Sequence, residues 1–339
     1  MSNVTVQQAQ TRSSWKGPEI SKEDFVYDLT QEHLAIFDRV VDGIRARGVT
    51  LKDLTEDEFL LSELRDTITA IASEILDGRG LVIVRGWPID RYSLEEIGIL
   101  FWAFGKFIGS PVVQNWKGDK LIQVRDLGQV TERGSTSNRE LPMHSDMEAV
   151  VGLLAIKKAK SGGVSTVASA RAVHDYIAQT RPEYLEPLYA GYRFRWRGDK
   201  DEQEIVADYA IPAFDRIGEH INAFLIKPYM ISSAADPDVP VFGIAKDALD
   251  YFEEVAGRPE IAFTFTLEPG EASIMCNYSV LHSRTTFEDW PELERRRLLL
   301  RLWLSLPDSR RPVHPNLRRF FVKDAFYGEK TKPNNSSRS

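Results

Sequence analysis

The chain of 339 residues contains one cysteine, Cys276, and only six histidines. A single cysteine cannot form an intrachain disulfide and offers no cysteine pair for a zinc site. The 43 Lys+Arg residues do not exceed the 50 Asp+Glu residues, so a net charge of −7 does not indicate a nucleic-acid partner. No apolar run is long enough to cross a bilayer, and the N-terminus lacks the basic and apolar regions of a secretory signal. We therefore expect a cytoplasmic protein with neither a membrane nor a nucleic-acid partner.

The rest of the composition is that of an ordinary globular protein, with 42% hydrophobic and 27% charged residues. The sequence has no internal repeat and no low-complexity linker. The polar ends, residues 1–20 and 328–339, are expected to be a disordered N-terminal tail and a flexible C-terminal tail. This leaves residues 21–327 as one domain.

The periodicity of apolar residues changes along this domain. Residues 63–78 and 93–108 have helical spacing, and a short buried strand lies between them within residues 80–88. From residue 112 onward the pattern is that of short strands separated by turns, interrupted by a helix at 171–190. The expected strands are 121–124, 150–157, 164–168, 192–197, 261–266, 272–276 and 297–304. Many short strands in one domain favour an α+β protein with a jelly-roll core, flanking N-terminal helices and a long insertion of about 198–245 between core strands.

The tripeptide His144-Ser145-Asp146 is the first candidate for chemistry. Residues i and i+2 of a strand point to the same side, so His144 and Asp146 can bind one ion while Ser145 points away. His282 is the candidate third ligand. Two histidines and one carboxylate on one face of a metal are typical of non-haem Fe(II) oxygenases.

An isolated His-x-Asp also occurs by chance, so the pattern alone is weak. Zinc is disfavoured because the sequence has no H-E-x-x-H pattern. The remaining histidines are better explained as surface or capping residues, with His220 open to either reading; they are His33, His174, His220 and His314.

A second candidate is the run from Arg297 to Leu304, in which Arg297, Arg301 and Trp303 share one face by the period-two rule. The leucines of the other face must pack against another layer, which leaves the Arg/Trp face for a barrel interior. An arginine buried there needs a carboxylate partner. The alternative is a surface strand with solvated arginines, and the position of His282 fifteen residues upstream favours the interior reading.

With these residues in place, the sequence resembles the Fe(II)/2-oxoglutarate dioxygenases of the taurine dioxygenase, clavaminate synthase and gamma-butyrobetaine hydroxylase superfamily. The resemblance covers roughly residues 75–305. It rests on a set of motifs in a fixed order: Arg85-Gly86, Phe104-Gly105 with Gly109-Ser110-Pro111, His144-Ser145-Asp146, Gly162-Gly163-Val164-Ser165, and His282-Ser283-Arg284 running into Arg296-Arg297.

The resemblance implies a double-stranded β-helix, iron held by His144, Asp146 and His282, and dioxygen as oxidant. It implies that Arg297 binds the distal carboxylate of the co-substrate 2-oxoglutarate, helped by Ser165 or its neighbour Thr166. Arg301 occupies a position where relatives often hold a substrate anion. Because Asp146 is retained, a halide site is not expected.

The expected activity is oxidation, with hydroxylation as the default, of a C–H bond in a small and anionic organic substrate, with release of succinate and CO2. Desaturation, epoxidation or ring closure by the same iron chemistry remains an alternative, as does a non-redox metal enzyme or a jelly-roll binding protein. Oligomeric state is not readable. Candidate substrate-lining residues are Gln114, Asn115, Trp116, Arg125, Met147, Glu148, Trp196, Tyr209, Asn277 and Arg301. Core or lid packing is the favoured explanation for the aromatic members, and Glu148 is an alternative partner for Arg301.

Overall fold

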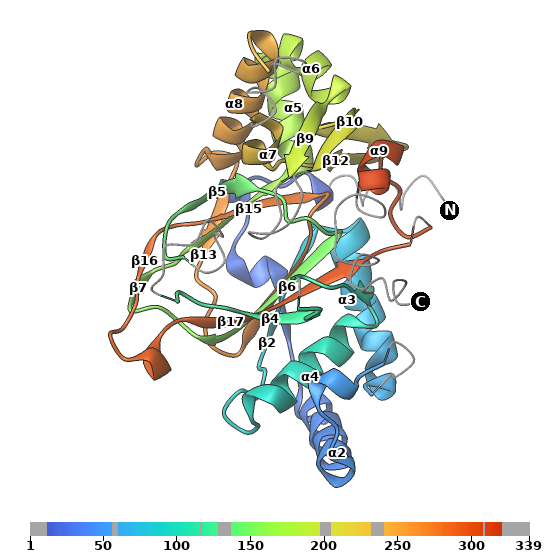
Figure 1. Ribbon diagram of the computed structural model, residues 1–339, viewed down its shortest axis with the longest axis vertical. Helices are drawn as coiled ribbons and strands as arrows, with labels where there is room; N and C mark the ends of the chain where they lie inside the picture. The colour runs from blue at the N-terminus through green and yellow to red at the C-terminus, as the bar shows by residue number, and fades with distance from the viewer. Residues whose placement is uncertain are drawn as a thin grey trace, which may run out of the picture.

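We describe the fold from a computed structural model of the chain, drawn in Figure 1. The structure describes residues 12–55, 60–115, 117–127, 137–196, 205–231, 241–307 and 309–320. No helix in these ranges combines the length and apolar composition that a membrane crossing requires.

The larger of two main sheets contains strands from both halves of the chain, because the strand order is β1-β2-β14-β6-β17-β3, with β4 also paired to β17. All pairs are antiparallel except β1 with β2. The strands are β1 (Val26–Asp28), β2 (Leu81–Arg85), β3 (Ser110–Pro111), β4 (Leu121–Val124), β6 (Val150–Lys157), β14 (Glu271–Cys276) and β17 (Leu298–Ser305). The strands predicted at 121–124 and 150–157 are confirmed with their bounds.

The smaller sheet has the order β13-β8-β15-β5 and faces the larger one, as Figure 1 shows. Its strands are β5 (Leu141–His144), β8 (Ser165–Ser169), β13 (Phe263–Phe265) and β15 (Val280–Arg284). A small ladder of β7 (Ser161–Gly162) with β16 (Phe287–Glu288) continues one end. Two facing antiparallel sheets that exchange strands in this way form a double-stranded β-helix, and the predicted jelly-roll core is confirmed.

The N-terminal helices lie outside the larger sheet: α2 (Gln31–Arg47), α3 (Arg65–Asp77) and α4 (Leu94–Gly105). Helix α4 begins where predicted, because Ser93 and Glu96 form a capping box. Its Gly105 lets the chain approach β17 closely: a Cβ there would lie 2.3 Å from a methyl of Leu302. The leucine face of β17 therefore packs against α4, as its alternation predicted.

A second helical group covers the smaller sheet, where α8 (Ile244–Gly257) contacts β5 and β8. The helix predicted at 171–190 is broken. It consists of α5 (Ala170–Thr180), a 3-10 turn (Pro182–Tyr184) and α6 (Leu185–Ala190), because Pro182 has no N–H to continue α5.

The insertion of about 198–245, which shows no clear sequence period, contains regular structure between its undescribed segments. It holds β10 (Ile205–Ile211), paired with β9 (Tyr192–Trp196), and the hairpin of β11 (Phe214–Ile217) with β12 (His220–Ala223). Helix α7 (Lys227–Ile231) follows, and α9 (Pro315–Arg319) contacts β10 from the C-terminal end.

Part of the predicted N-terminal tail, residues 1–20, lies within the described residues and is packed on the domain. Trp15 is 4% exposed, packs edge-on against Phe25, and donates its indole N–H to the carbonyl oxygen of Arg79 at 2.8 Å. Residues 12–20 are therefore part of the folded domain, since a buried aromatic side chain outweighs the polar composition around it. Residues 1–11 and 328–339 lie outside the described ranges.

The Gly162-Gly163 turn should be intolerant of a side chain. Gly162 has φ +73°, and a Cβ there would lie 2.3 Å from the carbonyl oxygen of Thr286. We expect Gly162→Ala to lower the free energy of unfolding by about 1–3 kcal/mol in urea titrations. Gly43→Ala is the control: Gly43 lies in α2 with open space around it, so alanine should be neutral or stabilise by about 0.5–1 kcal/mol. Equal stability of the two variants would contradict this account.

Candidate metal centre

The two predicted histidine ligands lie on neighbouring strands of the smaller sheet. His144 ends β5, His282 lies in the middle of β15, and the two are paired directly across the strands. Their ring centroids are 4.3 Å apart. Directly opposed residues of an antiparallel pair project to the same side, so the register alone brings both imidazoles together.

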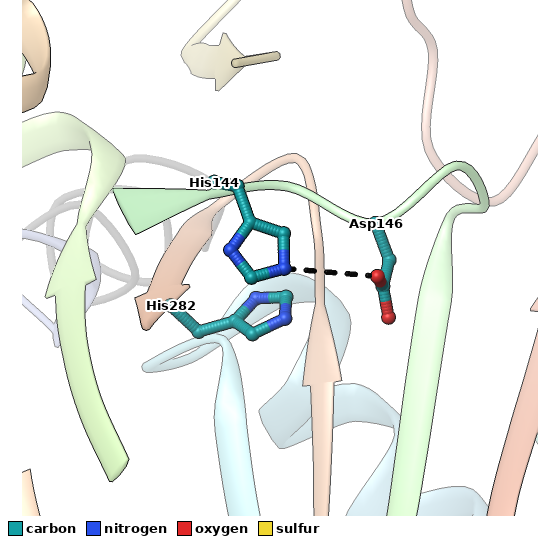
Figure 2. Close-up of side chains that lie close together, drawn as sticks. All are labelled: His144, Asp146 and His282. Atoms are coloured by element: carbon teal, nitrogen blue, oxygen red, sulfur yellow. Dashed lines mark ion pairs between the residues drawn. The ribbon is translucent and has the colours of Figure 1, made fainter. Parts of the chain in front are cut away.

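Asp146 completes the cluster from the loop between β5 and β6. Its Oδ1 lies 3.9 Å from Nε2 of His144. One candidate ligand atom from each of His144, Asp146 and His282 lies within 4.8 Å of the other two. In Figure 2 the three side chains point toward one another. The structure therefore brings together the three residues that the sequence predicted, and two nitrogens with one carboxylate oxygen suit a divalent metal ion.

The loop that carries Asp146 is fixed on both sides. Ser145 points away, as predicted, and is 1% exposed. Its N–H donates to the carbonyl oxygen of Leu225 at 2.8 Å, while its hydroxyl accepts the Leu225 N–H at 3.3 Å. The side chain of Asn277 accepts the N–H of Asp146 at 3.2 Å and donates to the carbonyl oxygen of Glu148 at 2.6 Å. Asn277, predicted as a substrate-lining residue, therefore also holds the loop that carries Asp146.

The histidines are held in a state suited to binding metal. Nδ1 of His144 lies 2.8 Å from the carbonyl oxygen of Pro142, which favours a proton on Nδ1 and leaves Nε2 as the free lone pair. Burial, and next the charge of His144, lowers the pKa of His282 to about 3. His282 is thus neutral at pH 7, as a metal-ligating imidazole must be.

The carboxylate of Asp146 interacts with a residue that sequence reasoning missed in this role. Trp303 of β17 donates its indole N–H to Oδ2 of Asp146 at 3.0 Å. Burial alone would raise the pKa of Asp146, but Arg301 and the two imidazoles outweigh it, so that pKa lies below its usual value. The only sign of this contact in the sequence was the period-two rule, which placed Trp303 and Arg301 together on the interior face of the strand.

Arg297, which immediately precedes β17, is buried and 7% exposed. Its guanidinium and that of Arg284 both stack on the ring of Phe287, at 5.2 and 4.7 Å from the centroid. Burial, and next the charge of Arg284, lowers the pKa of Arg297 to about 10. Its Nη1 atom is buried and has no hydrogen-bond partner among the described residues. A buried guanidinium with an unmet donor suits a carboxylate ligand.

Strand register separates the two candidate hydroxyl residues of β8. Ser165 lies opposite Arg284, and Thr166 lies opposite Ser283. Arg284 shares a face of β15 with His282, because the two are two residues apart. Ser165 therefore projects to the side of the metal ligands and Thr166 to the other side.

Arg301 also lies where the interior-face prediction put it. Its Nε donates to Oε1 of Gln114 at 2.9 Å, and its guanidinium stacks on Trp303 at 4.2 Å from the ring centroid. Gln114, 2% exposed, donates in turn to the carbonyl oxygens of Lys120 and Arg301. Gln114 thus orients Arg301.

The other predicted lining residues are less closely tied to the centre. Asn115 closes a local turn by accepting from the N–H groups of Lys117 and Asp119. Met147 is buried in the hydrophobic core, and Tyr209 stacks with Arg319. Arg125 donates to the carbonyl oxygen of Leu293. Trp116 and the side chain of Trp196 lie outside the described residues.

Together, the double-stranded β-helix and its His-Asp-His cluster define a class, that of non-haem metal oxygenases. The family model for the taurine catabolism dioxygenases of the TauD, TfdA family matches residues 47–303. Because the match spans most of the chain, the chain belongs to this family, and the predicted family is confirmed.

Two relatives agree with this membership. FR-33289 synthase of Streptomyces rubellomurinus is 30% identical over 328 residues, covering 93% of this chain and 95% of the relative. The taurine hydroxylase-like protein SAT17 of Stachybotrys chartarum is 24% identical over 304 residues, covering 85% and 77%.

Solved structures share the fold. An asparagine oxygenase bound to Fe(II), hydroxyasparagine and succinate superposes with a TM-score of 0.62 at 17% identity, covering 83% of this chain and 94% of that one. The non-heme iron oxygenase OrfP, with iron and alpha-ketoglutaric acid, superposes with a TM-score of 0.60 at 14% identity, covering 84% and 95%.

The protein is therefore an Fe(II)- and 2-oxoglutarate-dependent oxygenase acting on a small organic substrate. The residues present fit these cofactors: the donor set of the triad suits ferrous iron, and the unmet Nη1 of Arg297 suits a carboxylate. The alternatives of a non-redox metal enzyme or a binding protein are not supported by the family.

Glu148 should make the stability of the metal-free protein depend on pH. Burial raises its pKa from 4.5 to about 7, only partly opposed by the N–H of Ala149. Between these values the unfolded carboxyl ionises while the folded one stays protonated, so the wild type loses stability as pH rises from about 4.5 to 7. Relative to wild type, Glu148→Gln should gain as much as about 3 kcal/mol across this window in urea unfolding.

The control for this measurement is Glu186→Gln, which removes a carboxyl from the exposed face of α6. Parallel stability-against-pH curves for Glu148→Gln and the wild type would contradict the raised pKa.

Proposed function

We propose that His144, Asp146 and His282 hold the ferrous ion, that Arg297 with Ser165 binds the distal carboxylate of 2-oxoglutarate, and that the enzyme hydroxylates a small anionic substrate. The observation that carries the proposal is the convergence of the three triad side chains in a fold that also buries a guanidinium with an unmet donor, that of Arg297. Iron held by these residues would supply the chemistry that couples decarboxylation of 2-oxoglutarate, to succinate and CO2, to oxidation of the substrate by dioxygen. One oxygen atom of O2 enters succinate and the other enters the hydroxylated product.

The role of Arg297 rests on its surroundings. The guanidinium of Arg284 contacts the same Phe287 ring as that of Arg297. It adds a second positive charge, which makes the site more attractive to an anion. Arg284 itself donates to the carbonyl oxygen of Ser137, so it is held in place. Asp289 accepts the backbone N–H of Arg297 at 2.8 Å and fixes the start of β17. The Phe287 ring contact leaves Nη1 of the guanidinium without a partner in the described part of the chain, so that it can still donate to a carboxylate.

The substrate anion is assigned to Arg301. Gln114 and the Trp303 ring fix its side chain, and its charge is near enough to influence Asp146. A substrate anion at Arg301 would therefore lie beside the metal. Glu148 and Met147, which follow Asp146 in the same loop, are proposed to border the same space, with Asn115, Trp116, Trp196 and Tyr209 as further candidates.

Hydroxylation is the proposed outcome because it needs no further arrangement beyond a C–H bond held near the iron. Desaturation, epoxidation and ring closure use the same cofactors and would appear as different products. The proposed compartment is the cytoplasm, in keeping with the single buried Cys276.

Loss of the Arg297 charge should weaken co-substrate binding. A charge-assisted hydrogen bond contributes about 1.5–3 kcal/mol, so Arg297→Gln should raise the dissociation constant for 2-oxoglutarate roughly ten- to a hundredfold. The measurement is an anaerobic titration of the Fe(II) protein with 2-oxoglutarate, followed by the weak visible charge-transfer band of the chelate. Binding of Fe(II) itself should be nearly unchanged.

The matched control is Arg295→Gln, which removes the same charge two residues away from an exposed side chain. It should bind 2-oxoglutarate as the wild type does. An unchanged dissociation constant in Arg297→Gln would show that the co-substrate carboxylate binds elsewhere.

The anionic substrate class can be tested by succinate release from a panel of small carboxylates, sulfonates and phosphonates, each paired with its neutral amide or ester. We expect turnover with anionic members and not with their neutral counterparts. Arg301→Gln should raise KM for an accepted anion by about tenfold or more, in line with loss of a charged hydrogen bond. Equal turnover of both members of each pair would remove Arg301 from the substrate site.

A further inference from the structure

The contact between Trp303 and Asp146 has a role of its own. We propose that Trp303 is a positioning residue for the metal centre: its indole N–H holds one carboxylate oxygen of Asp146 so that the other oxygen faces the histidines. The inference rests on the proposed assignment of Asp146 as a metal ligand. It concerns a residue two positions beyond Arg301 on the same face of β17.

The two oxygens of Asp146 have different neighbours. Oδ2 accepts the indole N–H at 3.0 Å, and Oδ1 lies 3.9 Å from Nε2 of His144. An ionised carboxylate can accept on both oxygens and can bind a metal through one or both. A hydrogen bond to Oδ2 favours binding through Oδ1 alone, which leaves more of the metal open to other ligands.

The indole of Trp303 restricts the χ2 torsion of Asp146, which no other hydrogen bond within the described ranges restrains. The backbone of Asp146 is already held by Asn277, and its neighbour Ser145 is held by Leu225. What remains is rotation of the carboxylate about χ2, a torsion with a broad and shallow preference in aspartate. A directed N–H donor is the kind of contact that narrows this rotation.

The side chain of Trp303 is itself held firmly enough to position the carboxylate of Asp146. It is 6% exposed and lies inside β17, opposite Val151 of β6. Arg301 stacks on its ring at 4.2 Å, and Gln114 holds Arg301 in turn. The indole is therefore fixed by its strand and by its ring face, and sites built on strands place a donor more accurately than sites on loops.

The test is the affinity of the metal-free protein for Co(II), with the visible ligand-field bands of bound Co(II) as a second readout. Trp303→Phe keeps an aromatic ring for Arg301 and removes the N–H. We expect its Co(II) affinity to fall about 10–100-fold, as for other partners of metal ligands, and its bands to shift. Replacement of Trp303 by 3-benzothienylalanine, which keeps the indole shape without the N–H, should give the same result if the smaller phenyl ring disturbs folding.

The matched control is Trp15→Phe. Trp15 is also buried and also donates its indole N–H, but to the carbonyl oxygen of Arg79, far along the chain from the triad. It should bind Co(II) with wild-type affinity and spectrum. Urea unfolding of both variants separates lost stability from lost metal binding.

Different results would overturn the role of Trp303 and the assignment of the metal centre. If Asp146→Ala loses Co(II) while both Trp303 variants keep wild-type affinity and bands, Trp303 does not position the ligand and the metal centre stands. If Asp146→Ala binds Co(II) as the wild type does, the metal centre itself is wrongly assigned. A Trp303→Phe protein that is less stable but has an unchanged Co(II) spectrum also counts against the positioning role.

Discussion

The site depends on one cross-strand pair, His144 opposite His282. These residues are far apart in the chain, and only the exchange of strands between the two sheets brings β5 beside β15. Burial of the pair keeps His282 neutral, which leaves its lone pair available for a metal rather than a proton. A slip of one residue in this register would turn one imidazole to the opposite face of the sheet and end the cluster.

The polar side chains around the site lower the stability of the metal-free protein. Arg297 is buried with an unmet donor, and the partly buried Glu148 has no opposing charge among the influences on its pKa. Such groups destabilise the metal-free protein unless a ligand meets them. The other face of β17 offsets this cost, since Leu298, Leu300, Leu302 and Leu304 are buried in the core. One strand thus carries stability on one face and chemistry on the other.

The sequence predicted those parts of the site that follow from the period of a strand. His144 with Asp146, and Arg301 with Trp303, needed only the rule that alternate residues share a face. The hydrogen bond from Trp303 to Asp146 could not be predicted, because it joins residues 157 positions apart through the curvature of the sheets. The structured insertion and the burial of Trp15 were missed for a related reason: long-range packing decided both, against a local composition that reads as loop or tail.

The proposed metal ligands and the candidate substrate contacts lie on different kinds of structure. The metal ligands and Arg297 lie on or next to β5, β15 and β17, whose positions are fixed by ladder hydrogen bonds on neighbouring strands. Most of the remaining candidates for substrate contact lie on the turn after β3, in the loop after Asp146, or near the insertion. Loops tolerate change because few ladder bonds constrain them. A fold of this kind can therefore hold the proposed iron and co-substrate residues on its strands while its loops change, and Arg301 lies on a strand but is hydrogen-bonded to Gln114 of the turn after β3.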